Sequence, residues 1–248
     1  MLELGQRPKS ESGGTRRRIL DHAREAFNER GVAAVPIREI ARELDLSPGN
    51  VSYHFPTKEA LIAALVEEEH VANNALVGAT TEPLEFAEVE HIIRTIMRRD
   101  LENRWLMRDC VGLLTGLPSL RAVHEQMQRA REARVDGIVA RLIAAGSLDA
   151  ERATRALPQL RQQLLTQVAF WLPSAILAAP DRDPADALDD HARAALALFR
   201  AYCTPAGRRK LDALLEGEAS PAETNRTQRV ADRRPSPGKR RRSRVVRR

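Results

Sequence analysis

The sequence contains only two cysteines, Cys110 and Cys203, which lie far apart in segments with helical patterning. Two isolated cysteines form neither a disulfide framework nor a metal-ligand spacing, and such usage is typical of the reducing cytoplasm. The six histidines show no HExxH-type pairing, and the chain has no phosphate-binding loop and no nucleophile elbow. We therefore expect a protein that is not an enzyme and that uses no metal or cofactor.

Long apolar runs are also missing. No stretch approaches the roughly 20 apolar residues that a membrane-spanning helix requires. The first 14 residues are polar and contain no apolar segment of the kind found in secretion signals. From these absences we expect a cytoplasmic protein that does not enter a membrane.

The excess of positive charge is confined to one end of the chain. Of the 40 basic residues, eleven lie within 225–248, where a single acidic residue opposes them. The remainder has 29 basic and 33 acidic residues, so it is slightly acidic although the whole chain carries +6. The overall charge therefore gives no argument for nucleic-acid binding by the folded part, and the basic end is predicted to be a disordered tail.

Apolar residues recur at helical spacing along most of the chain, and no alternating pattern predicts a strand of useful length. Aromatic residues make up only 4 %, while alanine, leucine and arginine dominate, which favours an all-α fold. Prolines and glycines divide the pattern into about nine helices. Four N-terminal helices precede five longer ones at about 84–103, 104–116, 119–145, 151–179 and 185–216, and Pro158 and Pro173 are expected to bend the fourth of these five.

The first helix is predicted to begin at Thr15, a suitable N-cap, and to end at Gly31. The second helix has Pro36 at its first position, where a missing N–H is tolerated. A cluster of turn-forming residues, LSPGNVSYHFPTKEAL, then interrupts the pattern at 46–61.

This cluster is consistent with the end of one short helix and the start of two more. Ser47 can cap a third helix that begins at Pro48, and the Phe55-Pro56 pair ends it because the residue before a proline avoids the α region. Thr57 can cap the fourth helix. Two short helices joined by a tight turn form a helix-turn-helix, whose second helix enters the DNA major groove.

The residue types at this motif fit its packing. Ala41 provides the small residue required where the two helices touch, and Asp45 is acceptable at the left-handed turn position. Over roughly residues 15–65 the sequence resembles the N-terminal domain of the tetracycline-repressor (TetR) family of bacterial regulators. The residues that carry the resemblance are Gly31, Ile40-Ala41, Ser47, His54-Phe55 and Lys58-Glu59-Ala60-Leu61.

Three positions depart from the family pattern. Val35-Pro36 stands where the family usually has a hydroxyl residue, so a cap and a phosphate contact are missing. Asp45 replaces the turn glycine, and Ser52 replaces a tyrosine whose phosphate contact Tyr53 could take over. The resemblance implies a DNA-binding domain at 15–60 and a helical ligand-binding and dimerisation domain at 61–217. Their polar composition predicts that the flanking segments 1–14 and 218–248 are disordered tails.

The resemblance and the position of the short third helix indicate the residues that contact DNA. Asn50 could pair with adenine or could only cap its own helix. His54 could pack against the small core, and Lys58 could be a solvated surface cation instead of a phosphate contact. The full set of candidates is Arg16, Arg17, Pro48, Gly49, Asn50, Ser52, Tyr53, His54 and Lys58.

The resemblance also implies a small-molecule site in the C-terminal domain. Phe170 and Trp171 could instead lie at a dimer interface, and every candidate could be ordinary core. His91 and His124 could be polar groups of the site or surface residues. The candidate ligand-binding residues are the bulky or soft apolar ones, namely Met97, Trp105, Met107, Cys110, Phe170 and Trp171.

As a function, the resemblance implies a homodimeric transcriptional regulator, most often a repressor, that leaves a palindromic operator on double-stranded DNA when an unknown small effector binds. The helices at 151–179 and 185–216 are expected to form the dimer as a four-helix bundle. The alternative is an architectural protein that coats DNA through its arginine-rich tail.

Removing the basic tail by ending the chain at Gly217 should reduce the salt dependence of DNA binding. Each lost phosphate contact lowers the slope of log affinity against log salt by roughly 0.9, so a few contacts change it by a few units. Operator and scrambled duplexes should lose affinity about equally, because a disordered segment has no fixed register for reading bases. Salt titrations of both proteins measure this, and coinciding slopes would show that the tail does not touch DNA.

Overall fold

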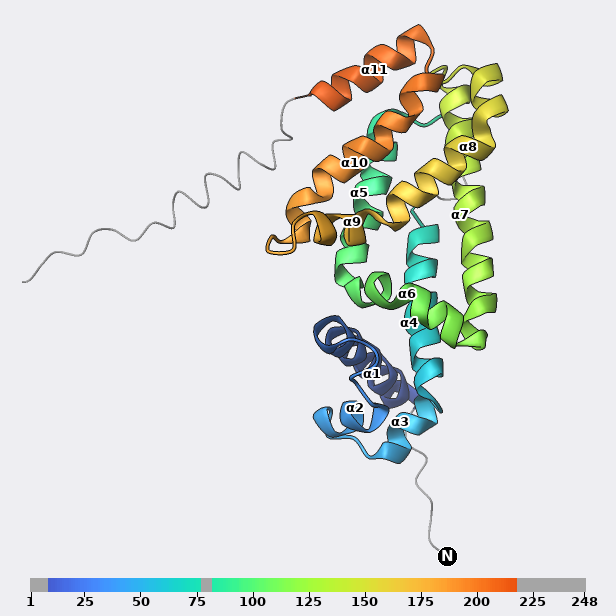
Figure 1. The fold of residues 1–248 in the computed structure, drawn as a ribbon. Coiled ribbons are helices and arrows are strands. Elements are labelled where there is room, and N and C mark those ends of the chain that lie inside the picture. Colours follow the sequence, from blue (N-terminus) through green and yellow to red (C-terminus); the bar gives the residue numbers. More distant parts are fainter. Residues whose placement is uncertain (1–8, 77–81, 218–248) are drawn as a thin grey trace, which may run out of the picture.

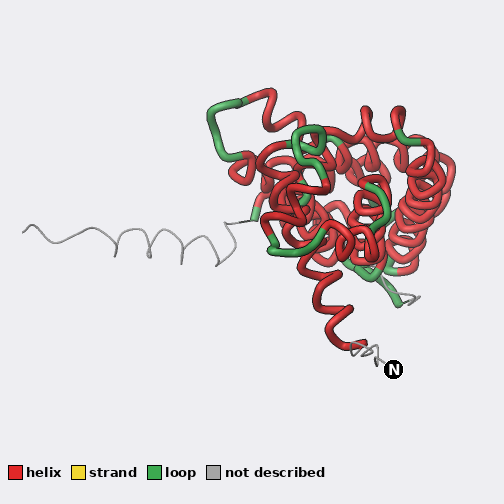
Figure 2. The backbone as a smooth tube through the Cα atoms, turned by 90° about the horizontal axis from the view of Figure 1, so that it is seen from below, coloured by secondary structure: helices red, strands yellow, loops and turns green. Residues whose placement is uncertain are grey.

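The computed structural model describes residues 9–76 and 82–217, and the regular elements in these ranges are all helices (Figure 2). Eleven α-helices and two short 3₁₀-helices follow one another, and an isolated β-bridge joins Leu148 to Cys203. The all-α prediction is therefore confirmed, whereas the expected number of about nine helices is too low. None of the described helices is long and apolar enough to cross a bilayer.

The helices are divided between a small and a large part. In Figure 1 the first three helices lie together at one end of the molecule, and α4 runs from them into the larger bundle, where it packs against α7. The small part contains α1 (Lys9–Arg30), α2 (Ile37–Glu43), α3 (Pro48–His54) and the start of α4 (Lys58–Asn74). The large part adds α5 (Phe86–Glu102), α6 (Arg104–Gly116), α7 (Pro118–Ala144), α8 (Ala150–Ala169), α9 (Trp171–Ala178), η1 (Pro184–Ala187), α10 (Leu188–Ala197), η2 (Leu198–Tyr202) and α11 (Pro205–Glu216).

The segment that interrupts the helical pattern forms the predicted helix-turn-helix. Ser47 and Thr57 each accept a hydrogen bond at 3.1 Å from the backbone N–H three residues on, so both predicted caps are confirmed. Asp45 has a φ of 59°, the left-handed conformation that the turn between α2 and α3 requires. Gly31, with a φ of 83°, follows the last residue of α1 as predicted.

Two helix starts differ from the prediction. α1 begins at Lys9, so Thr15 lies inside the helix and residues 9–14 of the expected tail are helical. No proline lies between Lys9 and Thr15, so nothing in the sequence forces the helix to begin later. Pro36 is the N-cap of α2 and not its first residue, and no side chain caps this helix. The rest of the two expected tails, 1–8 and 218–248, lies outside the described residues.

The two longest predicted helices, at 151–179 and 185–216, are both interrupted, which explains the larger number of helices. The first stops at Ala169 and resumes as α9, because Pro173 has no N–H for the Ala169 carbonyl and its ring clashes with that oxygen. Pro158 lies inside α8 without ending it. The second changes into a 3₁₀-helix and restarts as α11 at Pro205.

Two apolar clusters hold the helices together. The larger one is built mainly from α5, α7, α8 and α10. The smaller one surrounds Phe27 of α1, yet it also contains Trp105 of α6 together with Leu120 and Met127 of α7. The rings of Phe27 and Trp105 lie 5.5 Å apart. The small N-terminal part is therefore completed by side chains from the larger bundle.

Gly207→Ala should destabilise the protein by about 2 kcal/mol or more, because the new methyl group would lie 1.9 Å from the Ser147 carbonyl oxygen. Gly137→Ala is the matched control, since it lies inside α7 with open space around the same position. That change should stabilise by roughly 0.5–1 kcal/mol. Urea unfolding of both variants measures the effects, and equal stability of the Gly207 variant and wild type would contradict the close approach.

Candidate nucleic-acid interface and ligand cavity

Helix α3 buries Val51, and the Phe55 that follows it is buried too, while its other residues are exposed or half-buried. Val51 and the adjoining Phe55 are each only 2 % exposed, whereas Tyr53 is 78 % exposed. Its edge-on contact with the His54 ring, at 5.1 Å between centroids, supports the Tyr53 side chain from one side. The predicted contact residues Pro48, Gly49 and Ser52 are exposed as well, and Asn50 and His54 are half-buried. The predicted reading surface is therefore one continuous face of a short helix.

The capping role considered for Asn50 belongs to Ser47. The backbone N–H of Asn50 is the donor of the cap, and its side-chain amide has no hydrogen-bond partner within the described residues. An exposed amide on a firmly capped helix can donate and accept at the same time, which is the pattern that an adenine edge requires.

The three consecutive arginines of α1, Arg16 to Arg18, have different partners. The Arg16 guanidinium lies 5.2 Å from the centre of the Phe55 ring, beside α3. Arg17 instead pairs with Asp21 at 2.8 Å, and hydrogen bonding to this carboxylate raises the pKa of Arg17. Arg18 donates to the Leu44 carbonyl at 3.3 Å. Of the two predicted contacts, Arg16 thus lies beside α3, while Arg17 is paired with Asp21 of α1 and, at 3.8 Å, with Glu68 of α4.

Lys58 is half-buried and bonded within the protein. Its ammonium group donates to the Val32 carbonyl and lies 5.9 Å from the centre of the Phe27 ring. Burial lowers the pKa of Lys58. This position ties the start of α4 to the connection between α1 and α2. A phosphate contact by Lys58 stays a prediction. It would require the ammonium group either to bond to Val32 and the phosphate together or to break its bond to the Val32 carbonyl.

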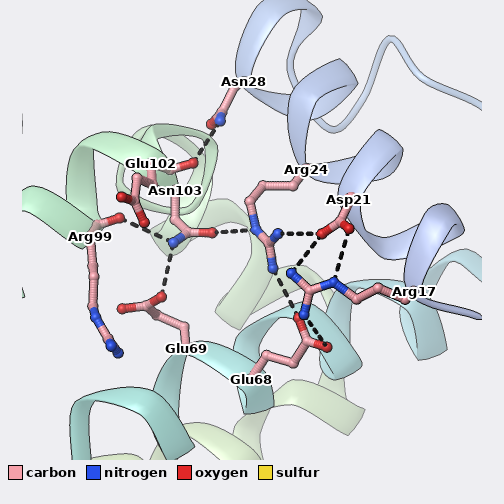
Figure 3. Close-up of polar contacts among 9 residues, drawn as sticks. All are labelled: Arg17, Asp21, Arg24, Asn28, Glu68, Glu69, Arg99, Glu102 and Asn103. Carbon is pink, nitrogen blue, oxygen red and sulfur yellow. Dashed lines mark hydrogen bonds and ion pairs between the residues drawn. The ribbon is translucent and has the colours of Figure 1, made fainter. Parts of the chain in front are cut away.

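A layer of polar contacts joins α1 to the larger bundle (Figure 3). Arg24 is at its centre and donates to Asn103 at 3.1 Å, to Glu68 at 2.9 Å and to Asp21 at 3.1 Å. Asn103 lies between α5 and α6 and is only 5 % exposed. Its amide group donates to Glu69 of α4 at 2.9 Å. Arg24 of α1 therefore contacts both α4 and the connection between α5 and α6 at the boundary between the two parts.

Helix α6 makes a second set of contacts with the small N-terminal part. The Arg108 guanidinium donates to the Phe27 carbonyl at 2.8 Å, and Asp109 accepts from the Val32 N–H at 3.2 Å. The backbone N–H of Trp105 donates to the Asn28 side chain at 3.0 Å. The predicted ligand residue Trp105 is thus part of the contact between the two parts. Sequence reasoning missed Arg108 and Asp109 because their partners are backbone groups some 80 positions away.

The larger bundle contains a cavity of about 400 Å³, within the range of small-molecule sites. Of the predicted ligand residues, Met107, Cys110 and Phe170 line it. The structure does not bring Met97, Trp105 or Trp171 into its lining, and these three are buried elsewhere in the two apolar clusters. His124 lines the cavity, whereas His91 is an exposed residue of α5. No group of three or more potential metal ligands occurs in the described part of the chain.

The cavity wall also contains charged residues that the sequence analysis did not single out. Asp100 of α5 is 8 % exposed and accepts a hydrogen bond from the Trp171 indole at 2.8 Å. Burial raises its pKa to about 7, although the bond from Trp171 opposes this shift. Arg131 of α7 lines the same cavity. Asp100 continues the apolar series Val89, Ile93, Met97 on α5, and this placement was the sequence signal that could have revealed it.

The wild type should become less stable as the pH rises from about 4 to about 7. Asp100→Asn should abolish this decrease. In that range the folded protein keeps a proton that the unfolded chain, with a pKa of about 3.9, has released. Stability therefore falls with rising pH, by up to a few kcal/mol in total.

Urea unfolding at pH 5 and pH 8 measures this loss, and asparagine can still accept the bond from Trp171. Glu125→Gln, at an exposed position of α7, is the control and should keep the wild-type pH dependence. An unchanged pH dependence in the Asp100 variant would show that this carboxyl does not titrate near neutral pH.

Two family models match the sequence on either side of a boundary within α4. The model of bacterial regulatory proteins of the tetR family matches residues 19–65, which contain the helix-turn-helix. The model of a bacterial transcriptional repressor matches residues 69–211, more than half of the chain by itself. Among curated proteins, the HTH-type transcriptional regulator UidR of Escherichia coli K12 is 33 % identical over 89 residues, or 36 % of this chain and 44 % of UidR. The chain thus matches less than half the length of this relative.

Solved structures extend the likeness in fold to both parts. A TetR-family transcriptional regulator from Marinobacter aquaeolei VT8 has a TM-score of 0.71 at 23 % identity, covering 82 % of this chain and 97 % of that one. SmeT, the repressor of the Stenotrophomonas maltophilia multidrug efflux pump SmeDEF, has a TM-score of 0.57 at 21 % identity, with coverages of 79 % and 93 %. The helix-turn-helix, the helical bundle behind it and the two family matches agree, and the chain belongs to the tetR family of bacterial regulatory proteins.

Proposed function

We propose that this protein is a DNA-binding transcriptional regulator, a homodimeric repressor that a small molecule releases from its operator in the cytoplasm. The observation that carries the proposal is the double role of α6. One side of this helix forms part of the cavity wall through Met107 and Cys110. Residues next to these, Arg108 and Asp109, bond to the end of α1 and to the connection that follows it.

DNA reading is assigned to the exposed face of α3. Asn50 lies in the first turn of this helix and Tyr53 in its last turn, and side chains of a recognition helix meet base edges and phosphates. Arg16 is positioned beside the same helix and adds positive charge. Firm capping by Ser47 and the buried Val51 hold this face in one orientation, which reduces the entropy lost on binding.

Release follows if the ligand-bound cavity favours another position of α6. A ligand shifts the equilibrium only by as much as it binds one arrangement more tightly than the other. Movement of α6 by a ligand in the cavity would be passed to α1 through Arg108 and Asp109. It would also act through Asn103, which lies immediately before α6 and bonds to Arg24. The published complex of SmeT with triclosan supports a small-molecule ligand for a protein of this fold.

The dimer is assigned to α8 and to the helices after it. Phe170, which follows α8, is 52 % exposed, and Ile176 and Leu177 of α9 are exposed at 42 % and 81 %. A partner subunit would remove this apolar surface from water. Two copies of α3 would then face DNA with two-fold symmetry, which requires a palindromic operator with half-sites about one helical turn apart.

Footprinting on the DNA upstream of the neighbouring genes tests the proposal. A short, palindromic protected region that shortens or disappears with a ligand supports a regulator. Extended protection independent of sequence would favour the alternative, an architectural protein that coats DNA through its arginine-rich tail.

Asn50→Ala and Tyr53→Ala should each weaken operator binding by about 1–3 kcal/mol if the side chain contacts a base edge. Both variants should fold normally, because neither side chain is buried. Gln126→Ala removes a similar amide from an exposed position of α7 and serves as the control with unchanged affinity. Mobility-shift titrations at one salt concentration compare the variants, and wild-type affinity in both would show that another surface reads the DNA.

A further inference from the structure

The cavity contains a positively charged side chain, Arg131, that forms no direct ion pair with a carboxylate in the described residues. The only hydrogen bond of the Arg131 side chain within the described residues runs to Gln128, one turn earlier on α7, at 3.1 Å. No ion pair joins Arg131 to an acidic side chain in the described part of the protein. Burial lowers the pKa of Arg131, so the protein disfavours a charge that an arginine nevertheless keeps.

The carboxylates nearest in effect, Asp100 and Glu69 of α4, attract this charge without bonding to it, and burial raises the pKa of both. Arg134, one turn further along α7, also lines it and donates to Asn74 at 2.6 Å. Burial and the nearby charge of Arg131 lower the pKa of His124, which favours the neutral imidazole, and a neutral imidazole supplies no counter-charge. Asp100 of α5 is the one acid among the described lining residues. It is bonded to Trp171, and its pKa of about 7 leaves it only partly ionised at neutral pH.

We propose that the cavity binds an amphipathic organic anion, with an apolar body and one carboxylate or similar acid group, and that Arg131 binds the acid group. This deepens the proposed function because it concerns the same cavity. The guanidinium can donate two parallel charge-assisted hydrogen bonds to a carboxylate. Pairing removes the free-energy penalty of a buried, uncompensated charge. The body of the ligand would contact apolar lining residues such as Ile92, Val135 and Leu165.

A cationic ligand held by Asp100 is the opposite possibility, and the surrounding charges disfavour it. It would add a third positive charge beside Arg131 and Arg134, in a partly buried site where water screens charges poorly. It would also have to pull Asp100 into its ionised form against the effect of burial. A neutral ligand would fill the apolar part and leave Arg131 uncompensated.

Three probes with the same eight-carbon chain separate these cases, namely octanoate, octan-1-ol and octylammonium. Isothermal titration calorimetry with the full-length protein at pH 7, without DNA, should give roughly tenfold or tighter binding of octanoate than of either other probe. Arg131→Met should reduce octanoate affinity to that of octan-1-ol and leave octan-1-ol unchanged. Arg129→Gln, an exposed position on the same helix, is the matched control and should change neither.

Equal affinity for octanoate and octan-1-ol, a preference for octylammonium, or no binding of any probe to the wild type would each overturn the proposal. Circular dichroism checks that the Arg131→Met variant is folded. Arg131→Lys, which keeps the charge, provides a second test and should retain a preference for octanoate. The calorimetry contains no DNA, so its result and that of the operator footprint are independent. A negative calorimetric result would overturn only the ligand class, and a negative footprint would overturn only the proposed function.

Discussion

The helix-turn-helix of this protein cannot close its own hydrophobic core. Helices α2 and α3 have seven residues each, too few to be stable without tertiary packing. They pack around Phe27 of α1, and the far side of that ring is covered by Trp105 of α6. The orientation of α3, the helix proposed to read DNA, therefore depends on where α6 lies. The proposed coupling between the two parts would follow from this shared packing.

The polar layer around Arg24 makes this dependence specific. Apolar contacts alone would let α1 slide over α6, because the hydrophobic effect has no preferred direction. Arg24 and Asn103, with Glu68 and Glu69 as acceptors, fix the register through bonds of about 3 Å. Removing one of these side chains would leave its hydrogen-bonding partners unpaired in a partly buried place, and this would lower the stability of the fold. Packed interfaces of this kind change between discrete arrangements, as a regulator with bound and released states requires.

The sequence was sufficient for local structure because local structure depends on neighbours. Caps at Ser47 and Thr57 and the left-handed turn at Asp45 follow from residue type and position, and all are present. Helix ends in the C-terminal part were harder, since periodicity continues across the break that Pro173 introduces. Which apolar residues line the cavity was not predictable, because Met107 and Trp105 lie two positions apart on α6 and face different surroundings. That choice depends on the packing of distant helices.

The charged residues of the cavity are better understood from their free-energy cost than from their spacing. A core selected only for stability would have apolar residues in place of Asp100 and Arg131. The free-energy penalty of desolvating a charge usually exceeds the stabilisation that an imperfect partner provides. Asp100 has Trp171 as a partner, so part of its cost is offset by a bond between α5 and α9. Arg131 has only an amide from its own helix as a bonded partner, and Asp100 and Glu69 attract it without bonding to it. The larger uncompensated cost therefore lies with Arg131, and a ligand that pairs with it would stabilise the arrangement of helices around the cavity in which that pairing is possible.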